Sequence, residues 1–142
     1  MDSRAFMWPV RVYWEDTDAG GIVFYANYLK FFERARTEWL RSLGVSQSDL
    51  RENTGGMFVV LETSVRYVKP ARLDDELSVT AEVKEWGRAS LIIEQQALRS
   101  GDPATAELIC EGTIRIGWVD AATLQPARIP PAILEALKRT QR

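Results

Sequence analysis

One segment in the first third of the chain limits the possible folds more than any other, because its apolar side chains repeat with helical spacing. From Asn27 to Leu43, apolar residues recur every three or four positions, as they do on one face of an α-helix. The apolar stripe is broad and consists of Tyr28, Leu29, Phe31, Phe32, Ala35, Trp39, Leu40 and Leu43. We therefore expect a long, largely buried helix, with Asn27 as its N-terminal cap and Gly44 in the left-handed conformation just past its end.

The chain after this helix has mainly the alternating pattern of β-strands. A polar stretch at 46–56 comes first, and four segments then carry apolar residues at every second position. These segments are 58–68, 76–86, 89–99 and 105–119. Gly87-Arg88 predicts a tight hairpin between the second and third segments, and residues 100–103 predict a turn between the third and fourth. Successive strands joined by short turns indicate an antiparallel sheet.

Two shorter elements complete the predicted order. Val10, Val12 and Trp14 alternate with polar positions, which predicts a short half-buried strand before the helix. Pro130-Pro131 predicts the start of a short C-terminal helix. One strand, one apolar helix and four antiparallel strands indicate an α+β fold in which the sheet wraps around or covers the helix. Because 142 residues suffice for one hydrophobic core, we expect a single domain spanning 1–142.

The composition excludes several classes of function. Lys and Arg number 18 against 20 Asp and Glu, for a formal charge of −2, so we expect no nucleic-acid partner. The chain has no histidine, which removes every mechanism that depends on an imidazole. Its single cysteine, Cys110, cannot form an internal disulfide, and we expect a small buried apolar residue there. No Cys or His cluster has metal-ligand spacing, so we expect no metal site.

The apolar runs of the chain are short. None approaches the roughly 18 consecutive apolar residues that a membrane-spanning helix requires. The first ten residues contain Arg4 and only a short apolar patch, unlike a secretory signal. We therefore expect a cytoplasmic protein without a membrane span.

Chemistry is most strongly indicated in the acidic loop that leads into the long helix. Asp16 and Asp18 precede the turn at Gly20-Gly21, and the helix follows within a few residues. Unpaired backbone N–H groups at a helix start can hold a developing oxyanion on an acyl carbonyl, while a nearby carboxylate attacks that carbonyl or activates water. The structural alternative is that the two aspartates form Asx-turns or cap the helix.

The order of residues in this region resembles a known enzyme family. Residues 11–28 read RVYWEDTDAGGIVFYANY, and residues 31–40 read FFERARTEWL. This pattern closely resembles the Tol-Pal-associated acyl-CoA thioesterases and their relative hydroxybenzoyl-CoA thioesterase, and a weaker resemblance continues to 84–86. The resemblance implies the hotdog fold, an antiparallel sheet wrapped around one long central helix. It also implies hydrolysis of a short-chain or aromatic acyl-CoA to free acid and CoA, for which we expect no metal and no cofactor.

The resemblance also assigns roles to residues of the acidic loop. Asp18 matches the catalytic carboxylate of the family and would act as nucleophile or as general base. Tyr25 matches the position whose backbone N–H contacts the oxyanion. Many Tol-Pal-associated members carry His at this position, so an imidazole-assisted version of the mechanism is not open to this chain. The expected supporting residues are Asp16, Gly21 and Asn27.

Binding of coenzyme A requires basic groups for its phosphates. Arg88, in the predicted hairpin, matches a phosphate-contacting position of hydroxybenzoyl-CoA thioesterase, and the alternative is a solvated turn residue. Charged residues on the long helix, among them Arg36, are expected to form solvated pairs at three- and four-residue spacing. The expected partners are acyl-CoA, with acyl carrier protein as another thiol carrier, and further copies of the chain in a homodimer or homotetramer.

Two other functions on the same fold compete with hydrolysis. The first is a non-catalytic protein that binds acyl thioesters or acyl carrier protein, linked as a scaffold to the Tol-Pal envelope system. The intact Asp18 and glycine turn argue against it. The second is a dehydratase for hydroxyacyl thioesters, but such enzymes rely on a catalytic histidine, which this chain lacks.

Overall fold

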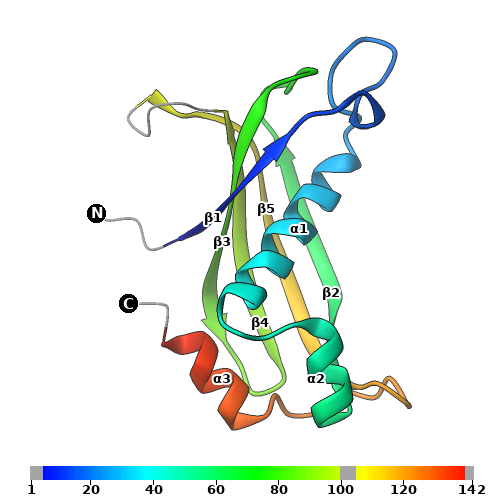
Figure 1. The fold of residues 1–142 in the computed structure, drawn as a ribbon, viewed down its shortest axis with the longest axis vertical. Coiled ribbons are helices and arrows are strands. Elements are labelled where there is room, and N and C mark those ends of the chain that lie inside the picture. Colours follow the sequence, from blue (N-terminus) through cyan, green and yellow to red (C-terminus); the bar gives the residue numbers. More distant parts are fainter. Residues whose placement is uncertain (1–4, 100–104, 140–142) are drawn as a thin grey trace.

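The strands of the computed structural model, which describes residues 5–99 and 105–139, form one antiparallel sheet (Figure 1). Its five strands follow the order β1-β3-β4-β5-β2, so β1 and β2 are the edges. The strands are β1 (Phe6–Arg11), β2 (Gly56–Tyr67), β3 (Glu76–Trp86), β4 (Ser90–Arg99) and β5 (Glu107–Asp120). The four later strands confirm the alternation in the sequence. The predicted turn at 100–103 lies outside the described residues.

Within the described residues, three α-helices accompany the sheet. The long helix α1 (Asn27–Ser42) lies across one face of the sheet (Figure 1), as its apolar stripe predicts. Gly44 follows it with a φ of 79°, which confirms the left-handed position. The polar stretch contains a helix that was not expected, α2 (Gln47–Thr54), and the C-terminal helix is α3 (Pro131–Lys138).

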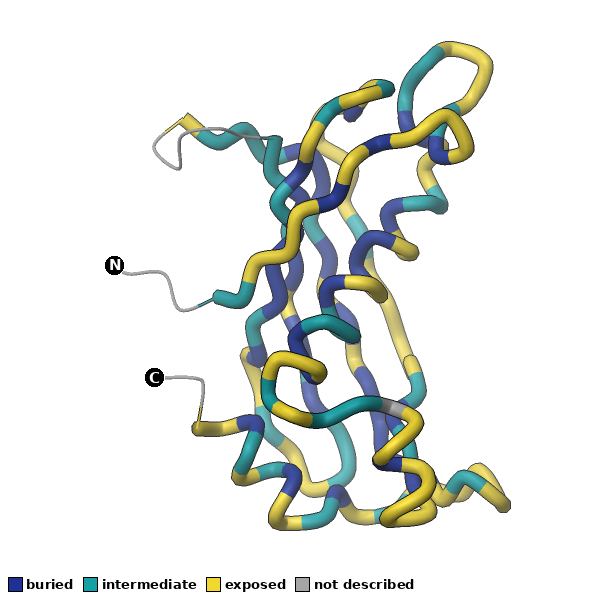
Figure 2. Tube along the Cα trace, in the orientation of Figure 1, coloured by how far each residue is buried: buried dark blue, intermediate teal, exposed yellow. Residues whose placement is uncertain are grey.

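The hydrophobic core fills the space between α1 and the sheet (Figure 2). From α1 it contains Tyr28, Phe31, Phe32, Ala35, Trp39 and Leu40. The sheet contributes the alternate side chains of its strands, such as Leu77 and Val79 of β3 and Ile93 of β4. Leu29 is 43% exposed, so the stripe is narrower on that side than the sequence indicates. Cys110 is fully buried, as expected.

A polar network inside this core joins α1 to the centre of the sheet. Gln95 of β4 is completely buried, and its Nε2 donates to the carbonyl oxygens of Phe32 and Thr80, each at 3.0 Å. Its Oε1 accepts a hydrogen bond of 2.9 Å from Nη1 of Arg36. Burial lowers the pKa of the Arg36 guanidinium. The expectation that Arg36 is a solvated surface charge is therefore wrong.

The first strand ends earlier than the alternation of Val10, Val12 and Trp14 predicts. Trp14 begins a short 3-10 turn, η1 (Trp14–Asp16), and is 78% exposed. The cause lies in the side chain of Asp16, whose Oδ2 accepts the Tyr13 N–H at 2.8 Å. A local hydrogen bond of this kind competes with the strand ladder for the backbone and turns the chain.

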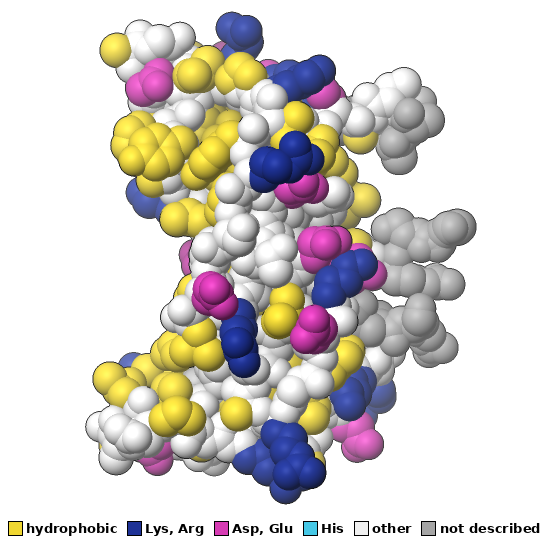
Figure 3. Space-filling model, turned by 180° about the vertical axis from the view of Figure 1, so that it is seen from behind, with side chains coloured by type: hydrophobic (Ala, Val, Ile, Leu, Met, Phe, Trp, Pro, Cys, Tyr) yellow, Lys and Arg dark blue, Asp and Glu magenta, His cyan; other side chains and the backbone are white. Residues whose placement is uncertain are grey.

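The sheet face turned away from α1 carries charged side chains of both signs (Figure 3). Arg66 and Glu111 form an ion pair there at 2.7 Å, and Lys84 lies 3.7 Å from Glu94. This face therefore carries charged side chains of both signs among hydrophobic ones (Figure 3). Among the helices of the described residues, none is long and apolar enough to cross a membrane.

Candidate active site

The acidic loop doubles back on itself before α1 begins. Thr17 pairs with Val23 in an antiparallel bridge, and the Asp18 N–H donates to the Ile22 carbonyl at 2.9 Å. Gly21 closes the tip with a φ of 80°, and its N–H donates to the Asp18 carbonyl at 3.0 Å. A side chain at this φ is strained, so the sequence places glycine where the turn requires it.

Asp18 is exposed at this tip, and its two carboxylate oxygens differ in their contacts. Oδ1 accepts a hydrogen bond of 2.8 Å from the Gly20 N–H, which is the Asx-turn that the structural alternative predicts. Within the described parts of the chain, Oδ2 has no hydrogen-bond donor. Asp18 therefore holds its turn with one oxygen while the other is free to meet a ligand or water.

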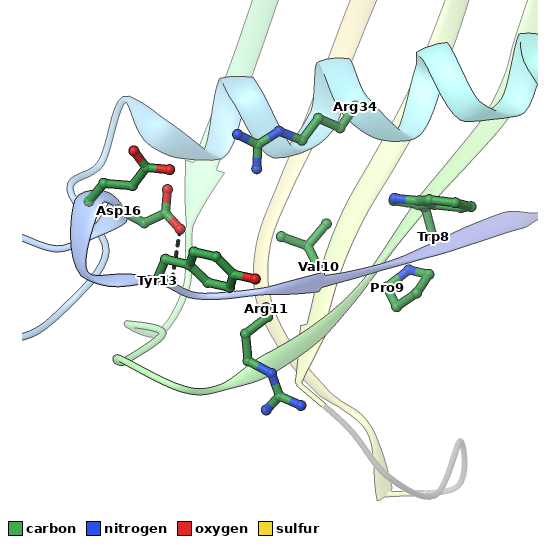
Figure 4. Close-up of a pocket in the computed structure, with 8 residues that line it drawn as sticks. Trp8, Pro9, Val10, Arg11, Tyr13, Asp16 and Arg34 are labelled. Carbon is green, nitrogen blue, oxygen red and sulfur yellow. Dashed lines mark hydrogen bonds between the residues drawn. The ribbon is translucent and has the colours of Figure 1, made fainter.

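Asp16 is buried and fixes the base of the loop. Besides its contact to Tyr13 (Figure 4), its carbonyl oxygen accepts from the Phe24 N–H and from Asn27 Nδ2, each at 2.9 Å. The expectation that Asn27 caps the helix is wrong, because Ala26 occupies the cap and Asn27 is the first helical residue. Asn27 instead ties the start of α1 to the loop. Asp16 and Asn27 thus support the loop through structural contacts.

Tyr25 lies where this loop meets the helix. Its side chain is 62% exposed. Its backbone N–H has no acceptor among the described residues, and it lies in the turn two residues before α1 begins at Asn27. The positive end of the helix dipole adds to the attraction of this N–H for a negatively charged oxygen. The loop and the helix start together bring a carboxylate and an unpaired amide to one corner of the molecule.

A hollow of about 230 Å³ opens beside the Tyr25 position. It lies between the helix start and the segment that follows β2, and it is lined by Ile22, Val23, Tyr25, Tyr28, Tyr67, Val68, Lys69 and Pro70. The Tyr67 ring contacts both other tyrosines, at centroid distances of 6.1 Å from Tyr25 and 5.8 Å from Tyr28. Asp18 is not part of the lining. The sequence assigns no role in the site to Tyr67, and it predicts Tyr28 only as a core residue.

A second hollow, of about 330 Å³, lies between β1 and α1 (Figure 4). Arg34 reaches toward it from the helix, and Arg11 and Tyr13 lie along the strand side. The carboxylate of Asp16 is also in its wall, but its Oδ2 is already bonded to the Tyr13 N–H. Because this hollow includes neither Asp18 nor Tyr25, the tyrosine-lined hollow is the better candidate for substrate.

Arg88 lies far from these residues within one chain. It is exposed in the hairpin between β3 and β4, at the end of the sheet opposite the acidic loop (Figure 1). The eleven residues of β3, at about 3.3 Å each, separate the two ends by roughly 35 Å. The structure therefore brings Asp16, Asp18, Gly21, Tyr25 and Asn27 together and leaves Arg88 apart.

Comparison with known proteins places this geometry in a family. The family model described as thioesterase-like superfamily matches residues 12–137. The chain belongs to the thioesterase-like superfamily. Its fold is the hotdog fold expected from the sequence. In the described part of this superfamily member, no group of three or more Cys, His, Asp or Glu residues is arranged to hold a metal ion.

Relatives of this superfamily member include two curated proteins that match it over almost their whole length. The acyl-CoA thioesterase YbgC of Haemophilus influenzae is 40% identical over 136 residues, covering 96% of each chain. The acyl-CoA thioester hydrolase YbgC of Escherichia coli O6:H1 is 40% identical over 139 residues, covering 98% of this chain and 100% of the relative. The structure of a 4-hydroxybenzoyl-CoA thioesterase is similar in fold, with a TM-score of 0.86 at 20% identity, covering 95% of this chain and 99% of that one.

Proposed function

We propose that this protein is an acyl-CoA thioesterase that uses Asp18 and the Tyr25 N–H to hydrolyse the thioester. The observation that carries the proposal is the pairing of a free carboxylate oxygen with an unpaired helix-start amide in one corner of the fold. Relatives at 40% identity are named as acyl-CoA thioesterases. The short-chain or aromatic acyl group occupies the tyrosine-lined hollow beside this corner.

The chemical step then uses two groups of the protein. The Tyr25 N–H donates to the carbonyl oxygen of the thioester and stabilises the negative charge that develops there. Oδ2 of Asp18 either attacks the carbonyl carbon or takes a proton from a water that attacks it. In the first route the C–S bond breaks, CoA leaves as a thiolate, and water opens the resulting mixed anhydride to the free acid. Neither route requires a metal or another cofactor.

The complete site needs a second copy of the chain. The hollow of about 230 Å³ is smaller than the roughly 300–1,000 Å³ of typical ligand pockets, so one chain alone encloses less space than a typical ligand site. The edge strand β2 lies next to it and exposes apolar side chains, with Val60 51% and Leu61 56% exposed. β2 is a long edge strand with no partner on its outer side among the described residues, and such an edge favours association. We propose that β2 of a second copy covers this edge in a homodimer or homotetramer.

Association also gives Arg88 a role. Its guanidinium is too far from Asp18 to serve the same site within one chain, but a neighbouring copy can present it to the phosphates of a bound CoA. A second thiol carrier that fits this arrangement is acyl carrier protein, whose thiol arm is joined to the protein through a phosphate. The protein acts in the cytoplasm, where acyl-CoA is the expected substrate.

The decisive test is Asp18→Asn. Oδ1 of the asparagine keeps the hydrogen bond from the Gly20 N–H, so the melting temperature should remain unchanged. The charge that attacks the carbonyl or water is lost, and kcat should fall on the order of a hundredfold or more. Thiol release is measured with short aliphatic, long aliphatic and aromatic acyl-CoA, with and without EDTA, which should have no effect.

Glu15→Gln is the matched control, because Glu15 is an exposed carboxylate three residues away whose loss should leave turnover intact. Asp18→Asn with wild-type turnover would reduce Asp18 to a turn residue. A wild-type protein that binds acyl-CoA but releases no thiol from any substrate would instead support the non-catalytic binding role.

A further inference from the structure

The hydroxyl group of Tyr28 is a buried hydrogen-bond donor without an acceptor in the described residues. Tyr28 is 3% exposed. Its oxygen accepts a hydrogen bond of 3.2 Å from the Ala71 N–H, but the phenolic hydrogen has no partner among residues 5–99 and 105–139. Buried donors are nearly always paired in proteins. The Tyr28 hydroxyl therefore points to a partner that the chain itself does not supply.

Tyr28 is also the inner wall of the hollow in which we place the acyl group. The three tyrosines of the hollow form a series from its rim to its floor, since Tyr25 is 62%, Tyr67 48% and Tyr28 3% exposed. The hydroxyl end of Tyr28 lies at Ala71, beside Pro70, which is another wall of the same hollow. A ligand that enters past Tyr25 and Tyr67 meets the Tyr28 hydroxyl last.

The position of Tyr28 separates it from the thioester carbonyl. Tyr25 lies in the turn just before α1 and Tyr28 in its first helical turn, and the Tyr67 ring contacts both. If the Tyr25 N–H holds the carbonyl oxygen at the rim, the floor is occupied by atoms further along the acyl group. Burial raises the pKa of the Tyr28 phenol, so this group remains protonated and able to donate at neutral pH.

We propose that the Tyr28 hydroxyl donates a hydrogen bond to an oxygen on the acyl group, beyond the thioester carbonyl, and so selects oxygenated acyl groups over their unsubstituted counterparts. This inference rests on the proposed thioesterase function. The apolar remainder of the hollow, with Ile22, Val23 and Val68 in its walls, surrounds the carbon skeleton. Tyr28 is then the specificity-determining residue of the site, because an unsubstituted acyl group leaves its donor unpaired.

Tyr28→Phe tests the proposal, because it removes the hydroxyl and keeps the ring that packs against Tyr67 and Phe31. The measurement is the ratio of kcat/KM within two matched pairs: 3-hydroxybutyryl-CoA against butyryl-CoA, and 4-hydroxybenzoyl-CoA against benzoyl-CoA. We expect the wild type to prefer the oxygenated member in at least one pair, and Tyr28→Phe to reduce that ratio roughly three- to tenfold, as one hydrogen bond allows. The ratio does not depend on the fraction of active protein.

Tyr13→Phe is the matched control, because Tyr13 is an exposed tyrosine in the other hollow, and its ratios should equal those of the wild type. The wild type alone supplies a second test, which holds even if Tyr28→Phe does not fold. Where the wild type prefers 3-hydroxybutyryl-CoA over butyryl-CoA, it should also prefer acetoacetyl-CoA, whose keto oxygen accepts a hydrogen bond but cannot donate one.

Unchanged ratios in both pairs, or an equal loss on both members, would overturn the inference and leave Tyr28 as a structural partner of Ala71. Loss of the preference with acetoacetyl-CoA would overturn it as well, because the hydroxyl would then not be the donor. These outcomes require thiol release by the wild type. A wild type that hydrolyses none of the substrates would refute the proposed function, and the inference with it.

Discussion

Gln95→Leu should strongly destabilise the protein, because one buried amide holds α1 to the sheet. Leucine has nearly the volume of glutamine, so the change removes hydrogen bonds without opening a large cavity. The Phe32 and Thr80 carbonyls each lose a donor at 3.0 Å, at about 1 kcal/mol each. Arg36 loses its 2.9 Å acceptor, at about 1.5–3 kcal/mol for a charged donor. Because Arg36 retains some access to water, we expect a total of about 2–4 kcal/mol.

The assay is urea unfolding at fixed protein concentration, since association would shift the apparent stability. The expected loss corresponds to a fall in melting temperature of about 6–12 °C for a chain of this size. Gln96→Leu is the matched control, because the adjacent side chain lies on the opposite face of β4. Arg36→Met should cost less in the Gln95→Leu background than in the wild type, because the two residues are coupled. A loss below about 0.5 kcal/mol, or purely additive costs, would refute this account of the network.

Two further predictions concern charged side chains away from the core. Lys69 and Arg99 hold the pKa of Glu107 below its ordinary value through hydrogen bonds of 2.8 and 2.7 Å. The stabilisation that these contacts give the folded protein is therefore complete above the pKa of Glu107 in the unfolded chain, about 4.3. It is lost as the pH falls through the lower pKa of the folded protein. Melting curves from pH 7 to pH 2 should show Glu107→Gln less stable than the wild type at pH 7 and equal to it at the acid end. A difference in melting temperature that stays constant over this pH range would contradict the assignment. Arg88→Ala should raise KM for acyl-CoA with kcat unchanged. Hydrolysis of acyl-pantetheine, which lacks the nucleotide, should be unaffected. Equal losses of activity on both substrates, with light scattering showing the same assembly, would mean that Arg88 supports the fold instead.

The sequence predicts those elements whose side-chain period matches their burial. The alternation at 76–86 reproduces β3 residue for residue, and the stripe that begins at Asn27 gives α1 within one residue of its end. The helix α2 is not predicted in this way because Leu50 is the only buried residue among the described side chains of α2, which is too little to produce a period. Its caps were the available signal, since Ser46 accepts the Asp49 N–H and Gly55 ends the helix with a φ of 74°.

The first strand shows how a local hydrogen bond defeats a periodic pattern. The alternation of apolar residues runs on through Trp14, but the Asp16 carboxylate captures the Tyr13 N–H and ends the strand at Arg11. The alternation of apolar residues reflects the burial of side chains and contains no information about backbone hydrogen bonds. The same residue also engages Asn27, whose Nδ2 donates to the backbone carbonyl oxygen of Asp16, and Asn27 lies inside α1 rather than at its cap.

The candidate site is predictable only where it is local in sequence. The Asx-turn of Asp18 and the positive φ of Gly21 follow from neighbouring residues, so the local sequence is sufficient to predict this turn. The floor of the hollow depends on a contact between Tyr28 and Ala71, 43 residues apart. In the sequence Tyr28 is one more apolar position of the stripe, and no period distinguishes a tyrosine that fills the core from one whose hydroxyl lies at a binding site.

The separation of Arg88 from Asp18 decides what a complete site must contain. Antiparallel pairing places Leu77 beside Arg99 and Trp86 beside Leu91, so the β3–β4 hairpin lies at the end of the sheet away from the acidic loop. No rearrangement short of breaking this register brings the two residues together. A resemblance assigns both to one reaction without saying which copy supplies each. If both act on one molecule of acyl-CoA, the site therefore spans two chains, and the exposed edge of β2 provides the surface on which a second chain can add.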